Sequence, residues 1–296
     1  VRLMVVERTL FGQLLPAYAK AHGHRFRVKD LALVLHAYAK AQLRSTAVFD
    51  ALKERCREQT QHMDCQALSV IAAAHAKLLI ADEVLFQALA WRLRSCARTC
   101  TFQAVANLAN AYAKFGFASP AAPDATRAPA SKSANRPVPG AVGITDAVFD
   151  LVLEELPRLL MESNAHSLVL LSHAAARAGQ HHRLPALPQR LSTSALQVLD
   201  TCDGAQLGMF SVAFAEILPM EAETEAFWLA LAETASNQTV KGELSIVDAA
   251  NCGIAFAAAK MSPEHIVASL QLSQYGEATL VAISPATACA LVLTHA

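Results

Sequence analysis

One short phrase returns along this chain at a fixed step, and that step constrains the fold more than any single residue does. Leu-His-Ala-Tyr-Ala-Lys at 35–40 returns as Ala-Ala-Ala-His-Ala-Lys at 72–77 and as Ala-Asn-Ala-Tyr-Ala-Lys at 109–114, two steps of 37 residues. A second phrase keeps the same step, from Phe49 to Phe86. The chain therefore contains a tandem repeat with two phrases in each copy.

The first phrase has the periodicity of an amphipathic helix. Its apolar residues fall at i, i+3, i+4 and i+7, and Lys40 lies off that stripe; these apolar residues are Leu31, Val34, Leu35 and Tyr38. The chain is 54% hydrophobic but only 6% aromatic, which favours closely packed helices over a β-sandwich or barrel. We therefore expect an all-α protein, an α-solenoid of stacked two-helix repeats of about 37 residues, with Asp30 and Asp64 near helix starts as caps.

The repeat also divides the chain. Beyond Lys114 the step rises to 63, so 63 − 37 = 26 extra residues separate the copies, and Pro, Ala, Ser and Gly dominate there. The sequence predicts basic helical repeats at 1–116, a flexible insert at 117–143, and degenerate helical repeats with an acidic final third at 144–296. The phrase Ala-Tyr-Ala-Lys at 17–20 is half a period out of step, which places it in the second helix of a preceding copy.

Charge is distributed unevenly along a chain with a formal net charge of zero. Residues 1–100 carry 15 basic and 8 acidic residues (+7), residues 101–200 carry 8 and 7 (+1), and residues 201–296 carry 2 and 10 (−8). This gradient predicts different partners at the two ends, with a polyanion at the basic end.

The repeat resembles the heptatricopeptide and octotricopeptide repeat proteins, relatives of the FAST-kinase-like and RAP-domain proteins of organelles. The resemblance rests on the two-helix period, the Ala-x-Ala-Lys ending and the Leu/Val-Phe phrase, and it covers residues 8–178 well and 200–270 weakly. It implies an RNA-binding α-solenoid that acts in mitochondrial or plastid RNA processing, RNA stability, translation or ribosome assembly, and of the two organelles we expect mitochondria. We recognise no RAP-like domain within these residues, so we expect no nuclease activity of the kind that such a domain would carry.

The first candidate site is a column with one cation in each repeat: Lys40, Lys77, Lys114 and Arg177. On stacked helices such a column would neutralise successive phosphates of a single strand. Alternatively, each cation only stabilises the C-terminus of its own helix.

Two further sets of residues are candidates. Four residues before the column stand His36, Ala73, Asn110 and His173, which predict contacts to bases or, alternatively, packing between helices. The second helices carry basic residues that suit bidentate phosphate binding or, alternatively, form a solvated outer face: Lys53, Arg55, Arg57, Arg92, Arg94 and Arg98.

The cysteines and the absence of catalytic motifs lead to negative predictions. Seven cysteines without a dense framework fit a reducing compartment. Cys96 and Cys100 could share a helix face with His62 or Cys65 as further metal ligands, but the spacing is not that of a zinc site, so we expect buried thiols, no metal and no cofactor. Phosphate-loop, zinc-protease, serine-hydrolase and dinucleotide motifs are missing, and we expect no enzyme.

Together these features predict a non-enzymatic RNA-binding subunit of a mitochondrial ribosome or RNA-processing assembly. Its basic N-terminal repeats would contact RNA, and its acidic final third would contact other protein subunits. One alternative is a protein-only helical-repeat scaffold of a mitochondrial complex. Another is a membrane-complex subunit held by its last helix, but Pro285 interrupts the uncharged segment 278–296, so we expect no membrane span.

Overall fold

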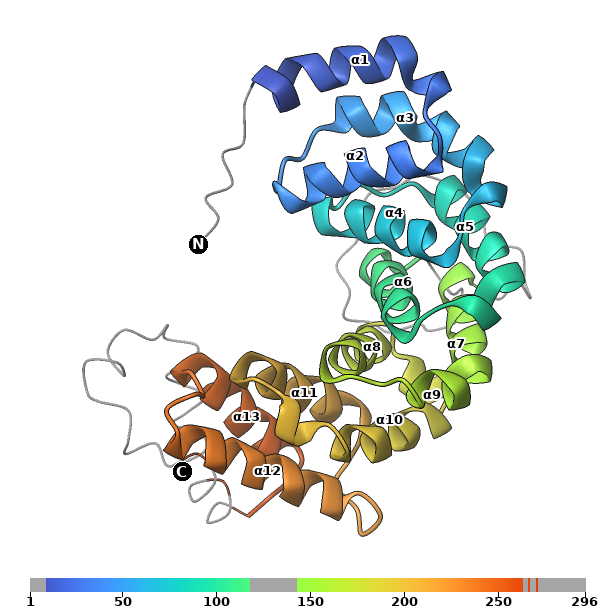
Figure 1. Cartoon of the computed structure of the whole chain (residues 1–296). Coiled ribbons are helices and arrows are strands. Elements are labelled where there is room, and N and C mark those ends of the chain that lie inside the picture. The colour runs from blue at the N-terminus through green and yellow to red at the C-terminus, as the bar shows by residue number, and fades with distance from the viewer. Residues whose placement is uncertain (1–8, 118–142, 263–265, 267–269, 271–296) are drawn as a thin grey trace, which may run out of the picture. The chain divides into compact units, whose positions relative to one another are not determined.

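A computed structural model shows an all-helical protein, as the sequence predicts (Figure 1). It describes residues 9–117 and 143–262, together with Ile266 and Leu270, and these residues form helices and turns without a strand. The predicted insert, apart from its two end residues, and the segment 278–296 lie outside the described residues. The chain divides into two compact units, residues 1–157 and 158–296.

In the first unit the helices alternate between two layers (Figure 1). Helix α1 (Leu15–His22) packs beside α3 (Thr46–Gln59), the second helix of the next copy. The Ala-Tyr-Ala-Lys phrase at 17–20 therefore belongs to a second helix, as its half-period offset predicted. The first layer contains α2 (Val28–Lys40), α4 (Cys65–Leu78) and α6 (Phe102–Phe115). The second contains α1 (Leu15–His22), α3 (Thr46–Gln59), α5 (Glu83–Cys96) and the part of α7 (Ile144–Leu160) that lies in this unit.

Burial follows the apolar stripe read from the sequence. Leu31, Leu35 and Tyr38 are at most 1% exposed, Val34 of the same stripe is half-buried, and Lys40 faces solvent. Asp64 is the N-cap of α4 and accepts a hydrogen bond of 2.8 Å from the Ala67 N–H, whereas Asp30 lies inside the first turn of α2 and accepts from the Arg27 N–H.

A contact between layers recurs with the repeat. The Tyr38 hydroxyl donates to the Phe11 carbonyl, and the Tyr112 hydroxyl donates to the Phe86 carbonyl, each at 2.6 Å. His75 occupies the equivalent position between these tyrosines, and its ring lies 4.8 Å from that of Phe49. Burial lowers the pKa of His75, so the ring is neutral at pH 7.

The turn after each first-layer helix also repeats, in the backbone rather than in the residue type. Gln42, Leu79 and Gly116 stand 37 residues apart and all have φ between 54° and 56°. Gly179, 63 residues after Gly116, has φ 62° in the second unit. This left-handed conformation favours glycine, yet two of the four positions carry a side chain.

In the second unit the same alternation surrounds a core that also contains aromatic side chains. The helices α8, α11 and α13 pack in sequence, and α10 packs beside α12. Gly208 allows the close approach of α11 to α13, because an added Cβ would lie 3.2 Å from the Asp248 side chain. The core includes Phe210, Phe214, Phe227, Trp228 and Phe256. The helices are α8 (Ala165–Arg177), α9 (Gln180–Arg183), α10 (Ala186–Leu196), α11 (Gly204–Ile217), α12 (Glu225–Val240) and α13 (Ile246–Ala258).

Candidate nucleic-acid interface

Two of the first-layer helices of the first unit, α4 and α6, are buried over most of their surface and present a narrow strip of side chains, whereas α2 is more exposed. In α4 ten of fourteen residues are buried, and the remaining four are Gln66, Val70, Ala73 and Lys77. Their spacing of i, i+4, i+7 and i+11 places them on one side of the helix. The equivalent positions are Lys29, Leu33, His36 and Lys40 in α2, and Gln103, Asn107, Asn110 and Lys114 in α6. We call these twelve positions the first-helix strip.

The fold brings three of the predicted column residues to equivalent places. Because α2, α4 and α6 pack side by side in that order, Lys40, Lys77 and Lys114 lie in the last turns of three neighbouring helices (Figure 1). Adjacent packed helices are about 8–10 Å apart. All three lysines are exposed, and none forms an ion pair within the described part of the chain.

The rest of the strip is mainly polar. His36 is exposed and Asn110 is half-buried, beside the small Ala73 of the same column. Sequence reasoning missed Gln66, Gln103 and Asn107, which carry amide groups able to donate and accept hydrogen bonds. Counting steps of 37 residues from Lys29 would have found Gln66 and Gln103, whereas the equivalents of Asn107 are the apolar Val70 and Leu33.

The predicted arginines of the second helices have partners within the protein. Arg55 Nε donates to the Phe26 carbonyl, and Arg92 Nε donates to the Met63 carbonyl, each at 2.9 Å and one repeat apart. These two side chains therefore tie each second-layer helix to the turn before the preceding first-layer helix.

Arg57 forms a partly buried ion pair that joins α3 to the start of α5. Its guanidinium lies 2.7 Å from Asp82 and 2.6 Å from Glu54. Burial alone would raise the pKa of Asp82, but hydrogen bonds from Arg57 and from the Leu85 N–H hold that pKa below its ordinary value. Since Leu85 lies in the first turn of α5, Asp82 both caps that helix and joins it to α3.

An open groove of about 480 Å³ separates the exposed sides of α3 and α5. Trp91, 69% exposed, lines it together with Arg57 and Arg92. Arg94 and Arg98 are exposed and form no ion pair in the part of the chain described here. Of the predicted arginines in the second helices, these two are the ones that face solvent.

In the second unit the equivalent strip keeps a cation on α8 and has none at the corresponding positions of α11 and α13. Arg177 at the end of α8 is exposed, and burial followed by the charge of Arg177 lowers the pKa of the half-buried His173. The next helix carries Glu216 at the position of Arg177, and α13 carries Ala258. The large exposed side chains on α11 and α13 are apolar: Met209, Val212, Val247 and Ile254.

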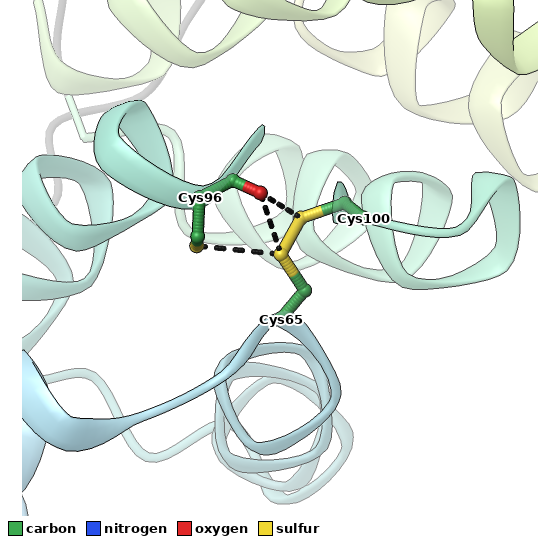
Figure 2. A group of neighbouring side chains, drawn as sticks. All are labelled: Cys65, Cys96 and Cys100. Carbon is green, nitrogen blue, oxygen red and sulfur yellow. Dashed lines mark hydrogen bonds between the residues drawn. A yellow bond between two sulfur atoms is a disulfide. The ribbon is translucent and has the colours of Figure 1, made fainter. Parts of the chain in front are cut away.

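Three cysteines meet where α4 begins and α5 ends (Figure 2). Cys65 and Cys100 form a disulfide with Cα atoms 5.3 Å apart, so the prediction of an unpaired buried thiol at Cys100 is wrong. Cys96 is half-buried with an unpaired thiol, and the three Sγ atoms lie within 4.8 Å of one another. The sequence offered either His62 or Cys65 as a neighbour of Cys96 and Cys100, and the packing of α4 against the turn after α5 brings Cys65 to them.

Comparison with known proteins found no family model and no curated protein that matches this chain. None of the helices in the described residues has both the length and the apolar character needed to cross a bilayer.

Proposed function

We propose that this protein is a non-enzymatic RNA-binding α-solenoid in which the first-helix strip contacts single-stranded RNA. The observation that carries the proposal is the column of Lys40, Lys77 and Lys114, exposed and without ion pairs on three adjacent helices. Such cations neutralise phosphates and release counterions, which is the main source of affinity for a single strand.

The polar side chains of the strip extend the proposal from phosphates to bases. Gln103, Asn107 and Asn110 on α6 provide amide groups beside Lys114. Helical-repeat proteins that read RNA use two or three side chains in each repeat for one base. Helix α4 offers fewer such groups, because its strip residues Val70 and Ala73 carry none. Base recognition is therefore concentrated on α6.

The resemblance to organellar tricopeptide-repeat proteins supports a place in a mitochondrial ribosome or RNA-processing assembly. The balanced net charge also supports work inside an assembly, because a free protein of high RNA affinity gains from a cationic excess. A cross-linking map of the assembly purified from mitochondria would test this part: cross-links from the first unit to RNA are expected, and a protein absent from mitochondria would contradict it.

The RNA proposal is tested by fluorescence anisotropy with the full chain and a single-stranded RNA over a salt series. Three phosphate contacts predict a slope of log affinity against log salt of about −2. Reversing Lys40, Lys77 and Lys114 to Glu should lower affinity at least ~100-fold at low salt, because three attractive contacts become repulsive.

The matched control reverses three cations of the second helices, Lys53→Glu, Arg94→Glu and Arg98→Glu. It changes the net charge equally, so a much smaller loss is expected if the first-helix strip is the interface. Failure of the wild-type chain to bind at low salt, a flat salt dependence, or an equal loss in the control would each remove the proposal.

A second function, a scaffold for protein subunits, is favoured by the apolar strip of the second unit. Met209, Val212, Val247 and Ile254 are each 38–53% exposed on α11 and α13, which pack side by side. Exposed apolar side chains gathered on one face mark protein interfaces. Val212→Asp combined with Ile254→Asp should then release protein subunits from the purified assembly without changing RNA affinity, whereas loss of RNA affinity alone would contradict this role.

A further inference from the structure

We propose that Cys65, Cys96 and Cys100 form a thiol–disulfide exchange site, in which the Cys96 thiol displaces Cys100 from its bond to Cys65 (Figure 2). The Sγ atom of Cys96 lies 3.3 Å from that of Cys65. This places a free thiol in contact with one sulfur of an existing disulfide, which is the starting arrangement for exchange.

The step conserves atoms and electrons. Cys96 loses its proton, its thiolate attacks Cys65 Sγ, and the bond between Cys65 and Cys100 breaks. Cys100 leaves as a thiolate and takes up the proton. The products are a Cys65–Cys96 disulfide and a Cys100 thiol, so the exchange needs no outside oxidant or reductant.

The surroundings accommodate thiols at all three positions. The Cys96 carbonyl oxygen lies 3.2 Å from Cys65 Sγ and 3.6 Å from Cys100 Sγ, so either sulfur, once it carries a proton, has an acceptor. Cys96 Sγ itself lies 3.3 Å from the Arg92 carbonyl. Burial raises the pKa of the Cys96 thiol; of the charged groups that act on it, Arg92 on α5 favours the thiolate and Asp64 at the start of α4 opposes it.

The exchange would change what the covalent bond connects. Cys65 is the first residue of α4, and Cys100 lies two residues before α6, so their disulfide joins consecutive repeats. Cys96 is the last residue of α5, so a Cys65–Cys96 disulfide would join the two helices of one repeat. The site therefore allows two disulfide pairings, which we call registers: Cys65–Cys100 between repeats and Cys65–Cys96 within a repeat.

The test uses tryptic mapping of the full chain, because trypsin cleaves after Arg98 and separates the two competing cysteines. The protein is equilibrated in glutathione buffers of several reduced-to-oxidised ratios, quenched with acid, alkylated and digested without reduction. Peptide 58–77 linked to 99–114 reports the Cys65–Cys100 register, and 58–77 linked to 95–98 reports Cys65–Cys96.

Both linked pairs are expected in the wild-type chain. Their interconversion should quicken about tenfold from pH 7 to pH 8, because the thiolate fraction of Cys96 rises by that factor below its pKa. Cys100→Ser should give only the 95–98 link, and Cys96→Ser only the 99–114 link. Cys56→Ser, which removes a buried thiol outside the cluster, should leave both registers in place.

Absence of the 95–98 link from the wild-type chain at every ratio and at pH 9 overturns the proposal, even if Cys100→Ser forms that link. A stoichiometric metal ion that protects all three thiols in the reduced protein, measured by elemental analysis, also overturns it in favour of a metal–thiolate site.

Discussion

The two units contain the same kind of helix layer, but its exposed side chains differ: they include a row of cations in the first unit and are mainly apolar in the second. In the first unit the exposed strip ends on Lys40, Lys77 and Lys114, whereas in the second unit Arg177 is followed by Glu216 and an alanine. Since packing fixes which positions are exposed and leaves their chemistry open, one architecture can present a cationic face in one unit and an apolar face in the other. The difference shows that a few exposed positions set the surface chemistry of each unit.

The units also differ in the contacts that hold their helices together. Substitution of Asp82 should give the largest loss of unfolding free energy. In the first unit Asp82 caps α5 and pairs with Arg57, whereas in the second unit Asp203 caps α11 through the Gln206 N–H. Asp82→Ala should lower the free energy of unfolding by about 3 kcal/mol, since it removes a cap and leaves a guanidinium without its buried partner. Asp203→Ala should cost about 1 kcal/mol. Urea unfolding measures both, and equal losses would contradict the distinction.

Acid should remove the same contribution from the first unit. Because the folded-state pKa of Asp82 lies below its ordinary value, its stabilisation is complete above the unfolded pKa of about 4 and disappears as pH falls through the folded value. Asp82→Asn keeps a capping side chain but loses the charge. The difference in unfolding free energy between wild type and this variant should be widest above pH 5 and shrink below pH 4. A difference that stays constant from pH 6 to pH 3 would show that the ion pair contributes nothing.

Substitutions at the repeated left-handed turn should change the unfolding free energy by a smaller amount, and with opposite sign in the two units. Leu79 holds φ 54° with a side chain that is 55% exposed, whereas Gly179 holds φ 62° without one. Leu79→Gly should raise the unfolding free energy by about 1 kcal/mol, and Gly179→Ala should lower it by about as much. Thermal unfolding of the two variants checks both signs; a loss of stability in Leu79→Gly would mean that its side-chain contacts outweigh the backbone strain.

The smallest effect, a change in RNA affinity, should come from giving the second unit a cation where the first unit has one. Glu216→Lys places a cation at the column position of α11, where Arg177 precedes it. One added phosphate contact should raise RNA affinity about threefold at low salt. The matched control is Glu233→Lys on α12, which makes the same charge change on an exposed second-layer residue and should raise affinity less. If both variants gain equally, net charge rather than the column governs binding.

Much of the helical arrangement was predictable from the sequence because the 37-residue step is a packing requirement. Leu31, Leu35 and Tyr38 face the interior for the reason their spacing indicates, and the offset of the Tyr18 phrase correctly assigned α1 to the second layer. The left-handed turn after each first helix was not visible, because Gln42 and Leu79 are poor markers of a conformation that glycine usually marks.

The site was predictable only in part, for a similar physical reason. Periodicity identifies Lys77 as exposed, since it lies off the apolar stripe, but periodicity does not state which cations are already paired. Arg55 and Arg92 reach backbone carbonyls 29 residues earlier in the chain, and Arg57 reaches Asp82 25 residues later. Such distant partners become visible only when the helices are packed.

The narrowness of the strip on α4 has a consequence for how a protein of this design could be re-engineered. Ten of its fourteen residues are committed to the interior, so substitutions there act on folding, while four positions remain whose exchange leaves the interior untouched. A library that varies Gln66 and Lys77 freely, and the half-buried Val70 and Ala73 among side chains of similar size, would therefore change the surface chemistry of this helix at little risk to the scaffold.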